Sequence, residues 1–384
     1  MRQSQPYECP WADEEIELFR DMVTRFLDTE MAPEDEAARK RGHVGHEIWR
    51  RAGELNLLCS DIPEEYGGAG GDFRHEAVFL EEMARRGLTG MNTGVHSIVA
   101  HYLLNHGTAE QRERYLPRMA RGELVGAIAM SEPDAGSDLQ AIRTRAVADG
   151  DHYRLSGAKT WISNGYLAGL VLVVCKTDPS AGAKGTSILI AETEGLDGYR
   201  VGRVLDKIGM KAQDTSELFF DEVELHRDQL LGGEEGKGFY QLMGDLPYER
   251  LIISVNAVGA IEGALAATID YTKERRAFGQ SVFDFQNSKF KLAEIATQAR
   301  VARTYLDRCI QDLLDEKLDT VGASMAKMWT TDLQNRVIDE CLQLFGGYGY
   351  TNEYMVGRMY IDARVQRIYG GTNEIMKEVI SRSL

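Results

Sequence analysis

Four short segments combine glycines with hydroxyl, amide or guanidinium side chains, a mixture suited to binding a large polar ligand. They are residues 129–138 (AMSEPDAGSD), 275–279 (RRAFG, with Gln286 shortly after), 343–350 (QLFGGYGY) and 368–374 (IYGGTNE). In the first of them, small hydroxyls, glycine and free backbone N–H groups would allow an extended polar ring system and a nearby phosphate to approach closely. Taken alone, that segment is more typical of an ordinary turn.

Two further glycine-rich segments, residues 66–72 and 232–238, lack the spacing of a phosphate-binding loop and of a dinucleotide-binding turn. We expect them to be turns.

The histidines do not form a metal-binding pattern. No His-Glu-x-x-His sequence occurs, no cysteine accompanies them, and a spacing of five does not stack imidazoles on one helical face. We therefore expect no metal site and a structural or surface role for His43, His46, His96, His101 and His106.

Composition and charge limit the class of protein. The 384 residues predict two or three domains. With 60 acidic and 44 basic residues, the net charge of −16 argues against a nucleic-acid partner. Five scattered cysteines without a Cys-x-x-Cys pair indicate a reducing compartment. No run reaches the ~18 consecutive apolar residues that a membrane helix requires, and no signal or transit peptide is recognisable. We expect no membrane span, and a cytoplasmic protein or the mature form of an organelle enzyme.

The periodicity of apolar residues predicts a helical part, a β part and a second helical part. Helical spacing covers residues 13–27, 75–86 and 108–121, with Thr108 as a plausible N-cap, and returns at 250–272, 287–314, 324–345 and 373–382. Between them, short segments rich in β-branched residues predict an antiparallel β unit that includes residues 153–161, 170–176, 186–191 and 217–223. We place the domains at residues 1–123, 124–235 and 236–384.

Taken together and in order, the four motif segments resemble the acyl-CoA dehydrogenase family over nearly the whole chain, and its long-chain type most. Residues 129–141 match the first signature of the family, residues 343–362 match the second, and residues 63–68 (PEEYGG) are similar to its N-terminal domain. The resemblance implies a mainly α fold with an N-terminal α-helical domain, a central antiparallel β-domain and a C-terminal four-helix bundle. It also implies FAD as the cofactor and a homotetramer built from two dimers.

The resemblance assigns roles to individual positions. Ser131 is similar to the residue that hydrogen-bonds the flavin ring, and Arg275 to the arginine that holds the FAD pyrophosphate, where a planar fork of donors suits phosphate oxygens. Gln286 and residues 343–347 resemble FAD contacts made across a dimer interface, and the helix that begins at Thr372 can donate backbone N–H groups to a phosphate. The expected FAD-binding set is Ile128, Met130, Ser131, Gly136, Ser137, Trp161, Ile162, Ser163, Arg275, Phe278, Gln286, Gln343, Leu344, Gly346, Gly347, Thr372, Asn373 and Glu374. The expected substrate-binding set is Ser137, Tyr240, Pro247, Arg250, Gly370 and Gly371.

One departure from the commonest family pattern concerns the catalytic base. In those members a glutamate follows the tyrosine of the last motif, but here that position is Gly370. A second branch carries its glutamate at the start of the first long C-terminal helix, and residues 247–251 (PYERL) match that branch with Glu249 as the base. A carboxylate that takes a proton α to a thioester needs a water-poor pocket, and a second carboxylate there would repel it.

The mechanism that the resemblance implies is an α,β-dehydrogenation of an acyl-CoA thioester to a trans-2-enoyl-CoA. The flavin ribityl 2′-hydroxyl and the backbone N–H of Gly370 polarise the thioester carbonyl, Glu249 takes the α-proton, and flavin N5 takes the β-hydride. An electron-transfer flavoprotein is the expected oxidant of the reduced flavin. The alternatives are an acyl-CoA oxidase or a flavin monooxygenase on the same scaffold, or a non-catalytic acyl-CoA-binding protein. We further expect Gly370 to leave room for a methyl branch on the acyl chain.

Overall fold

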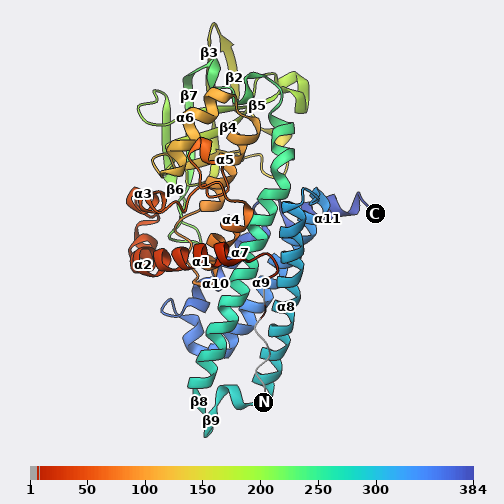
Figure 1. Ribbon diagram of the computed structural model, residues 1–384. Helices are drawn as coiled ribbons and strands as arrows, with labels where there is room; N and C mark the ends of the chain where they lie inside the picture. Colours follow the sequence, from red (N-terminus) through yellow and green to blue (C-terminus); the bar gives the residue numbers. More distant parts are fainter. Residues whose placement is uncertain (1–6, 8) are drawn as a thin grey trace. The chain divides into compact units, whose positions relative to one another are not determined.

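The computed structural model describes Tyr7 and residues 9–384, which divide into two compact units (Figure 1). Each unit is discontinuous in sequence. The first contains residues up to 28, residues 72–87 and residues 250–384, and the second contains residues 29–71 and 88–249. The predicted domain boundaries at 123/124 and 235/236 stay predictions.

The first unit is helical. It contains α1 (Glu14–Phe26), α4 (Phe73–Arg85), the larger part of α7 (Gly238–Glu274), α8 (Gln286–Leu314), α9 (Thr320–Phe345), α10 (Met355–Ala363) and α11 (Asn373–Ser381), together with a small hairpin of β8 (Arg276–Ala277) and β9 (Gln280–Ser281). Helix α9 lies at the centre of its C-terminal part, in contact with α8, α10 and α11. Helix α7 packs closely on α4 because Gly259 and Gly263 face it, and an added Cβ at either position would collide with the α4 backbone.

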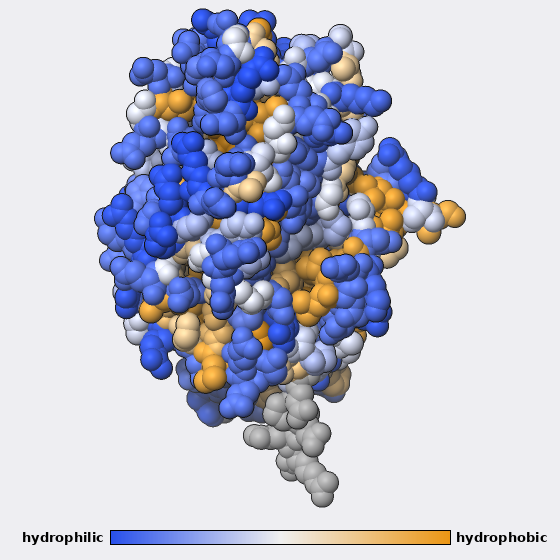
Figure 2. Space-filling view, turned by 45° about the horizontal axis from the view of Figure 1, so that its top comes forward, coloured by the Kyte–Doolittle hydropathy of each residue, from blue (hydrophilic) through white to orange (hydrophobic). Residues whose placement is uncertain are grey.

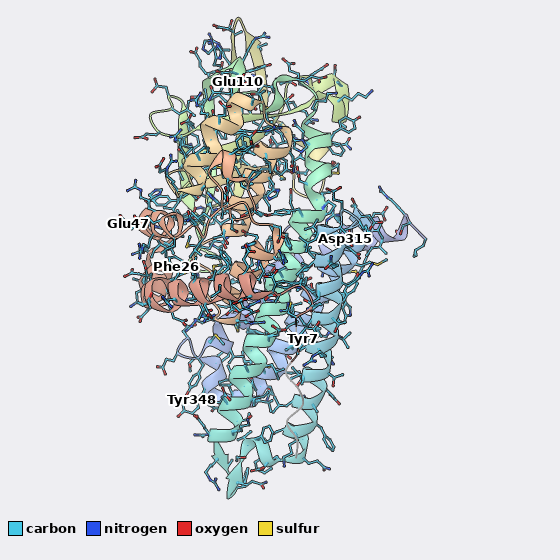
Figure 3. All side chains as sticks on the ribbon, viewed as in Figure 1. Tyr7, Phe26, Glu47, Glu110, Asp315 and Tyr348 are labelled. Atoms are coloured by element: carbon cyan, nitrogen blue, oxygen red, sulfur yellow. The ribbon has the colours of Figure 1, made fainter. Side chains whose placement is uncertain are left out.

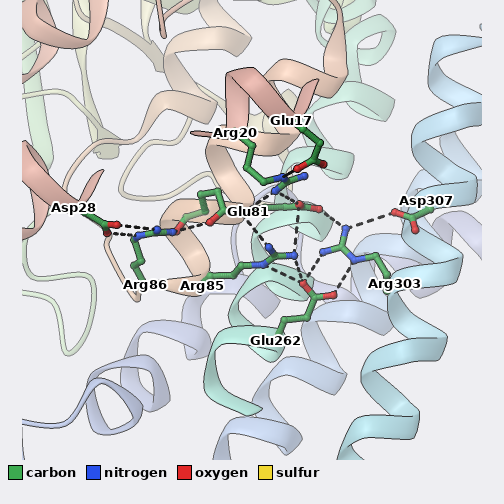
Figure 4. A network of polar contacts seen from close by, with 10 residues as sticks. Glu17, Arg20, Asp28, Glu81, Arg85, Arg86, Glu262, Arg303 and Asp307 are labelled. Atoms are coloured by element: carbon green, nitrogen blue, oxygen red, sulfur yellow. Dashed lines mark hydrogen bonds and ion pairs between the residues drawn. The ribbon is translucent and has the colours of Figure 1, made fainter. Parts of the chain in front are cut away.

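A network of buried charges ties four helices of this unit together (Figure 4). The Arg303 guanidinium on α8 bridges Glu81 on α4 and Glu262 on α7, with its Nε 2.9 Å from Glu262 Oε1. Arg20 on α1 reaches Glu82 on α4 at 2.7 Å. A buried charge that loses its partner is strongly destabilising, so the network fixes how these helices pack.

The second unit combines α2 (Ala32–Arg41), α3 (His46–Glu54), α5 (Thr93–His106) and α6 (Ala109–Ala120) with a seven-stranded sheet. The strands are β1 (Gly126–Ala129), β2 (Arg145–Asp149), β3 (His152–Ser163), β4 (Leu170–Lys176), β5 (Thr186–Glu192), β6 (Tyr199–Val204) and β7 (Thr215–His226). Their order is β1-β4-β2-β3-β7-β6, and β5 pairs with β4. The core includes Leu155, Val171, Val173, Leu218 and Val223.

The sheet is mixed, whereas the sequence predicted an antiparallel unit. Strands β1 and β4 are parallel, with Gly126 opposite Leu170, and β2 meets β4 in a single parallel pair. Parallel neighbouring strands need a long connection in the chain, and here the β2–β3 hairpin lies between β1 and β4 and provides it. The remaining neighbours are antiparallel, as predicted.

Several predicted elements are confirmed at or near their boundaries. Asp13 caps α1, Thr108 and Gln111 form a capping box at the start of α6, and β4 spans the predicted seven residues. The start of the first long C-terminal helix was wrong, because α7 begins at Gly238 and contains Pro247 in its interior. The prediction rested on the apolar periodicity that follows Arg250, and Pro247 does not end the helix here. The short helix α10 was not predicted.

Helix α7 is, within the described part of the chain, the one helix long and apolar enough to cross a membrane by length and composition. About two thirds (67%) of its apolar window is buried inside the fold, and the core helix of a protein without membrane spans passes the same test. Figure 2 shows a face on which hydrophilic side chains predominate, with apolar ones in scattered groups.

Candidate active site

The end of β1 and the end of β3 bring the first group of predicted cofactor residues together in the second unit. Ile128 lies in β1, and Met130 and Ser131 follow the strand directly. The backbone N–H of Thr160 on β3 donates to the carbonyl oxygen of Ser131 at 3.0 Å. The segment of Ser131 therefore lies beside the end of β3 that carries Trp161, Ile162 and Ser163.

A buried ion pair holds this segment in place. Lys159 Nζ on β3 donates to Glu132 Oε1 and to the carbonyl oxygen of Met130, each at 2.9 Å. Glu132 also accepts the backbone N–H groups of Arg143 at 2.6 Å and Thr144 at 2.9 Å. Burial alone would raise the pKa of Glu132, but Lys159 and these donors hold it below its usual value.

Trp161 has an unusual backbone and an exposed ring. Its φ is +64°, it lies at an irregularity in the pairing of β3 with β7, and 64% of its surface is exposed. A bulge turns a side chain out of the regular alternation of a strand, and it often does so beside a functional site. Ile162 is buried, and Ser163 Oγ accepts a hydrogen bond from Gln213 at 3.2 Å.

Gly136 and Ser137 lie in an exposed turn after Ser131. An added Cβ at Gly136 would meet no atom within 4 Å, so the backbone there is open to close approach by a ligand.

The second group of predicted cofactor residues belongs to the first unit. A cavity of about 510 Å³ is lined by residues that include Tyr271, Arg275, Phe345 and Tyr348, the last of which is labelled in Figure 3. The rings of Tyr271 and Phe345 stack at 4.1 Å, and the Arg275 guanidinium lies 5.4 Å from the centre of the Tyr348 ring.

The other predicted residues of this group lie at the ends of helices. Gln343 and Leu344 are in the last turn of α9, Gly346 and Gly347 follow that helix, and Gln286 is the first residue of α8. Phe278, in the β8–β9 turn, is 96% exposed with a φ of +50°.

The last predicted segment begins α11 and is held by a buried lysine. Thr372 caps the helix, and its hydroxyl accepts the N–H of Ile375 at 3.3 Å. Lys327 Nζ on α9 donates to the carbonyl oxygen of Gly371 at 2.8 Å and to Asn373 Oδ1 at 2.9 Å. Burial, followed by the nearby Arg250, lowers the pKa of Lys327 to about 8. Asn373 is thus buried and hydrogen-bonded within the protein, whereas its neighbour Glu374 is exposed.

Position 370 cannot accommodate a side chain without rearrangement. Gly370 has a φ of +64°, a conformation that favours glycine, and an added Cβ would overlap Cδ1 of Ile253 on α7. Ile253 Cδ1 lies on the Cβ side of this glycine, so a group placed there would require the end of that side chain to shift. The expected room for a methyl branch on the acyl chain stays a prediction.

Glu249 is a buried carboxylate in the interior of α7. Only 8% of its surface is exposed, and it lies three turns after Gly238 rather than in the first turn. Tyr102 on α5 donates its hydroxyl hydrogen to Glu249 Oε1 at 2.8 Å. Because Glu249 is far from the helix start, attraction to the helix dipole does not explain its position.

The remaining predicted substrate residues lie in or beside this helix. Tyr240 is exposed in its first turn, Pro247 is half-buried, and Arg250 is buried with its guanidinium 2.9 Å from Ser324 Oγ.

The histidines contact protein groups. His96 Nδ1 accepts the N–H of Gly126 at 3.1 Å, His101 contacts Asp61 at 2.9 Å, and His106 contacts Asp245 at 2.7 Å. Among the described residues, no group of three or more His, Cys, Asp or Glu side chains is arranged to hold a metal ion.

Comparison with known proteins gives the same order of domains along the chain: a helical domain, a β-domain and a second helical domain. Residues 13–123, 127–223 and 236–384 match the N-terminal, middle and C-terminal domains of acyl-CoA dehydrogenase. The long-chain specific acyl-CoA dehydrogenase of Mus musculus mitochondria is 48% identical over 96% of this chain and 86% of its own length.

Solved structures give the same result. An acyl-CoA dehydrogenase from Geobacillus kaustophilus superimposes with a TM-score of 0.94 at 43% identity, over 98% of this chain and 99% of its own. A glutaryl-CoA dehydrogenase from Mycobacterium smegmatis in complex with FADH2 has a TM-score of 0.90 at 27% identity, over 97% of this chain and 95% of its own. The chain belongs to the acyl-CoA dehydrogenase family, whose members are flavoprotein oxidoreductases that dehydrogenate acyl-CoA in fatty acid β-oxidation.

Each of the two groups of residues, taken by itself, has features that suit part of a flavin cofactor. The exposed Trp161 ring offers a flat apolar surface beside the Ser131 segment, and Arg275 offers a charged donor on the surface of the other unit. Added Cβ atoms at Gly346 and Gly347 would meet nothing within 4 Å, which leaves their backbone accessible.

Four residues around the predicted site were missed from the sequence. Tyr102, Lys159, Lys327 and Ile253 contact predicted site residues from distant positions in the chain. Each lies in an ordinary helical or strand pattern, so no local signal distinguishes it.

Proposed function

We propose that this enzyme converts a fatty acyl-CoA to the trans-2-enoyl-CoA, with FAD as cofactor and Glu249 as the base that takes the α-proton. The observation that carries the proposal is the buried Glu249 carboxylate, which receives a hydrogen bond from a fully buried tyrosine. Burial favours the neutral form of a carboxyl group and so makes its carboxylate a stronger base.

The geometry at position 370 supports the same assignment. The commonest family members carry their base at this position, but here the positive φ disfavours any side chain and Ile253 Cδ1 lies where a Cβ would be placed. Ile253 lies one helical turn after Glu249 on α7, so the helix that carries the proposed base also packs a side chain against Gly370.

The chain's own groups then have separate tasks. The backbone N–H of Gly370 polarises the thioester carbonyl and makes the α-proton more acidic. Glu249 accepts that proton on a carboxylate oxygen. FAD, when bound, would supply the oxidising chemistry as the acceptor of the β-hydrogen. Arg250, Ser137 and Tyr240 bind the acyl-CoA.

The FAD contacts are proposed from the two groups of residues described above. Ser131 and Ser163 hydrogen-bond the ring, Trp161 packs beside it, and Arg275 binds the pyrophosphate. Gln286 and residues 343–347 bind FAD across a dimer interface, in a homotetramer of two dimers. The electron acceptor is an electron-transfer flavoprotein. The five free cysteines fit a reducing compartment, either a cytoplasm or an organelle matrix.

Substitution of Glu249 tests the proposal. We expect Glu249→Gln to fold and to bind FAD at wild-type stoichiometry, but to lose at least ~10²–10⁴-fold in kcat, the contribution typical of a positioned base. Turnover is measured across acyl-CoA chain lengths with an artificial electron acceptor. Asp270→Asn, at an exposed position near the other end of α7, controls for loss of a carboxylate from the same helix. If Glu249→Gln keeps more than about a tenth of kcat, a share far above what loss of a base allows, Glu249 is not the base.

A further inference from the structure

Helix α5 holds two carboxylates of α7 with three side chains on one of its faces. Tyr102 donates to Glu249 Oε1 at 2.8 Å, Asn105 Nδ2 donates to Asp245 Oδ1 at 2.7 Å, and His106 Nε2 contacts Asp245 Oδ2 at 2.7 Å. Positions 102, 105 and 106 share a helical face, as do 245 and 249. The three contacts therefore fix the rotation of α7 about its axis at the turn that carries Glu249.

Tyr102 has the burial and the ionisation state that a permanent hydrogen-bond donor needs. It is 0% exposed, and a buried hydroxyl requires a partner to offset its loss of water. Burial raises the pKa of Tyr102 well above its usual value, and the charges of Glu249 and Asp245 raise it further. The hydroxyl therefore keeps its hydrogen at neutral pH and remains a donor to Glu249.

We propose that Tyr102 is a positioning residue for the catalytic base: its hydroxyl holds the Glu249 carboxylate, through Oε1, in the orientation in which it takes the substrate α-proton. The inference rests on the proposed role of Glu249. A protonated carboxyl group still accepts a hydrogen bond at its carbonyl oxygen, so the tyrosine contact is compatible with both protonation states of Glu249. The proton leaves the α-carbon as the C–H electron pair stays on the substrate, and no other group changes its protonation.

The contact also affects how easily Glu249 is protonated. A donor to the ionised form stabilises that form, so loss of the Tyr102 hydroxyl should change the pH dependence of proton transfer to Glu249.

Other charged or ionisable groups lie on the same two helices and on a preceding loop. They are His101 and His106 on α5, Asp245, Tyr248 and Arg250 on α7, and Asp61, which accepts the Tyr248 hydroxyl at 2.8 Å. Tyr102→Phe leaves all of them in place.

The experiment isolates proton transfer from oxidation. Enzyme whose flavin is fully reduced cannot accept hydride, but its base can still exchange the α-hydrogen of an acyl-CoA with solvent. Exchange in deuterium oxide is followed by mass spectrometry of a straight-chain acyl-CoA over a range of pH. The matched control is Tyr115→Phe, which removes a hydroxyl from a second buried tyrosine of the same unit that does not contact Glu249.

We expect Tyr102→Phe to lower the plateau exchange rate about 10- to 100-fold, the range expected for one hydrogen bond to a charged group. The acidic limb of its pH profile should shift to higher pH. In turnover, kcat should fall while KM stays within about twofold, because the substrate-binding contacts are intact. Tyr115→Phe should match the wild type in all three measurements.

The possible failures are distinguishable. If Glu249→Gln still exchanges the α-hydrogen at the wild-type rate, the base assignment itself fails. If Glu249→Gln loses exchange but Tyr102→Phe behaves like Tyr115→Phe in rate and pH profile, Glu249 remains the base and Tyr102 does not position it. An equal loss of thermal stability in both tyrosine variants with no shift of the pH profile also overturns the proposal, because it indicates a role in packing alone.

Discussion

The buried ion pair of Lys159 with Glu132 should control both the stability of the second unit and its affinity for flavin. Lys159→Met keeps much of the length and apolar volume of the lysine stem but removes the charge. It leaves Glu132 with two backbone donors and the carbonyl oxygen of Met130 without the Nζ donor. The segment that carries Ser131 then loses the side chain that holds it against β3.

The magnitude follows from what remains around Glu132. Removing one partner of a buried ion pair typically destabilises a protein by ~3–5 kcal/mol. Because two backbone N–H groups still compensate Glu132, we expect a loss at the lower end, about 3 kcal/mol. Glu132→Gln in the Lys159→Met background removes the uncompensated charge and should recover at least half of this loss.

Thermal and urea unfolding monitored by circular dichroism, together with flavin content after purification, measure the effect. Lys176→Met is the control, since Lys176 is also buried in the sheet but bonds the Gly182 carbonyl and the Thr186 hydroxyl. The folded-state pKa of Glu132 is lowered, so the stabilisation by the pair is present at neutral pH and is lost as pH falls through that pKa. Wild type and Lys159→Met should therefore converge in acid. Equal losses for Lys159→Met and Lys176→Met, or no recovery in the double variant, would refute the reasoning.

Three other predictions concern cofactor binding, pH and packing. Arg275→Ala should lower flavin occupancy and the melting temperature, because a cofactor bound to the folded state stabilises that state. Arg276→Ala, at the neighbouring exposed arginine, is the control and should change neither quantity. Unchanged flavin occupancy in Arg275→Ala would show that Arg275 does not bind the pyrophosphate. Burial lowers the pKa of His96 from 6.5 to about 4 in the folded state. Between these two pH values His96 is protonated in the unfolded chain but not in the folded protein, so the free energy of unfolding should fall as pH is lowered from 6.5 to 4. A His96→Gln variant whose unfolding showed the same pH dependence as wild type would contradict that assignment. Gly370→Ala should destabilise the protein, and Ile253→Ala should relieve part of the strain in the double variant; additive losses would show that Ile253 does not cause it.

Elements with a complete local signal were predictable from the sequence. Thr108 and Gln111 form a capping box within four residues, and β4 is a continuous apolar run between turns, so each prediction needed only its own segment. The start of α7 was not predictable in this way, because the helix continues through Gly244 and Pro247, two residue types that usually weaken or interrupt a helix. A long buried helix can offset the hydrogen bond that a proline lacks through its packing, which no local pattern reports.

The sequence by itself determined the family, the order of helical and β parts, and Glu249 as the candidate base, because these depend on short contiguous motifs. Only the tertiary structure decided which side chains from other parts of the sequence contact those motifs. Tyr102 and Glu249 are 147 positions apart, and the contacts of Lys159 with Glu132 and of Ile253 with Gly370 likewise join distant segments. Such contacts depend on the rotation of one helix against another and on the register of strands. Each is set by the packing of many side chains together rather than by the residues at either end.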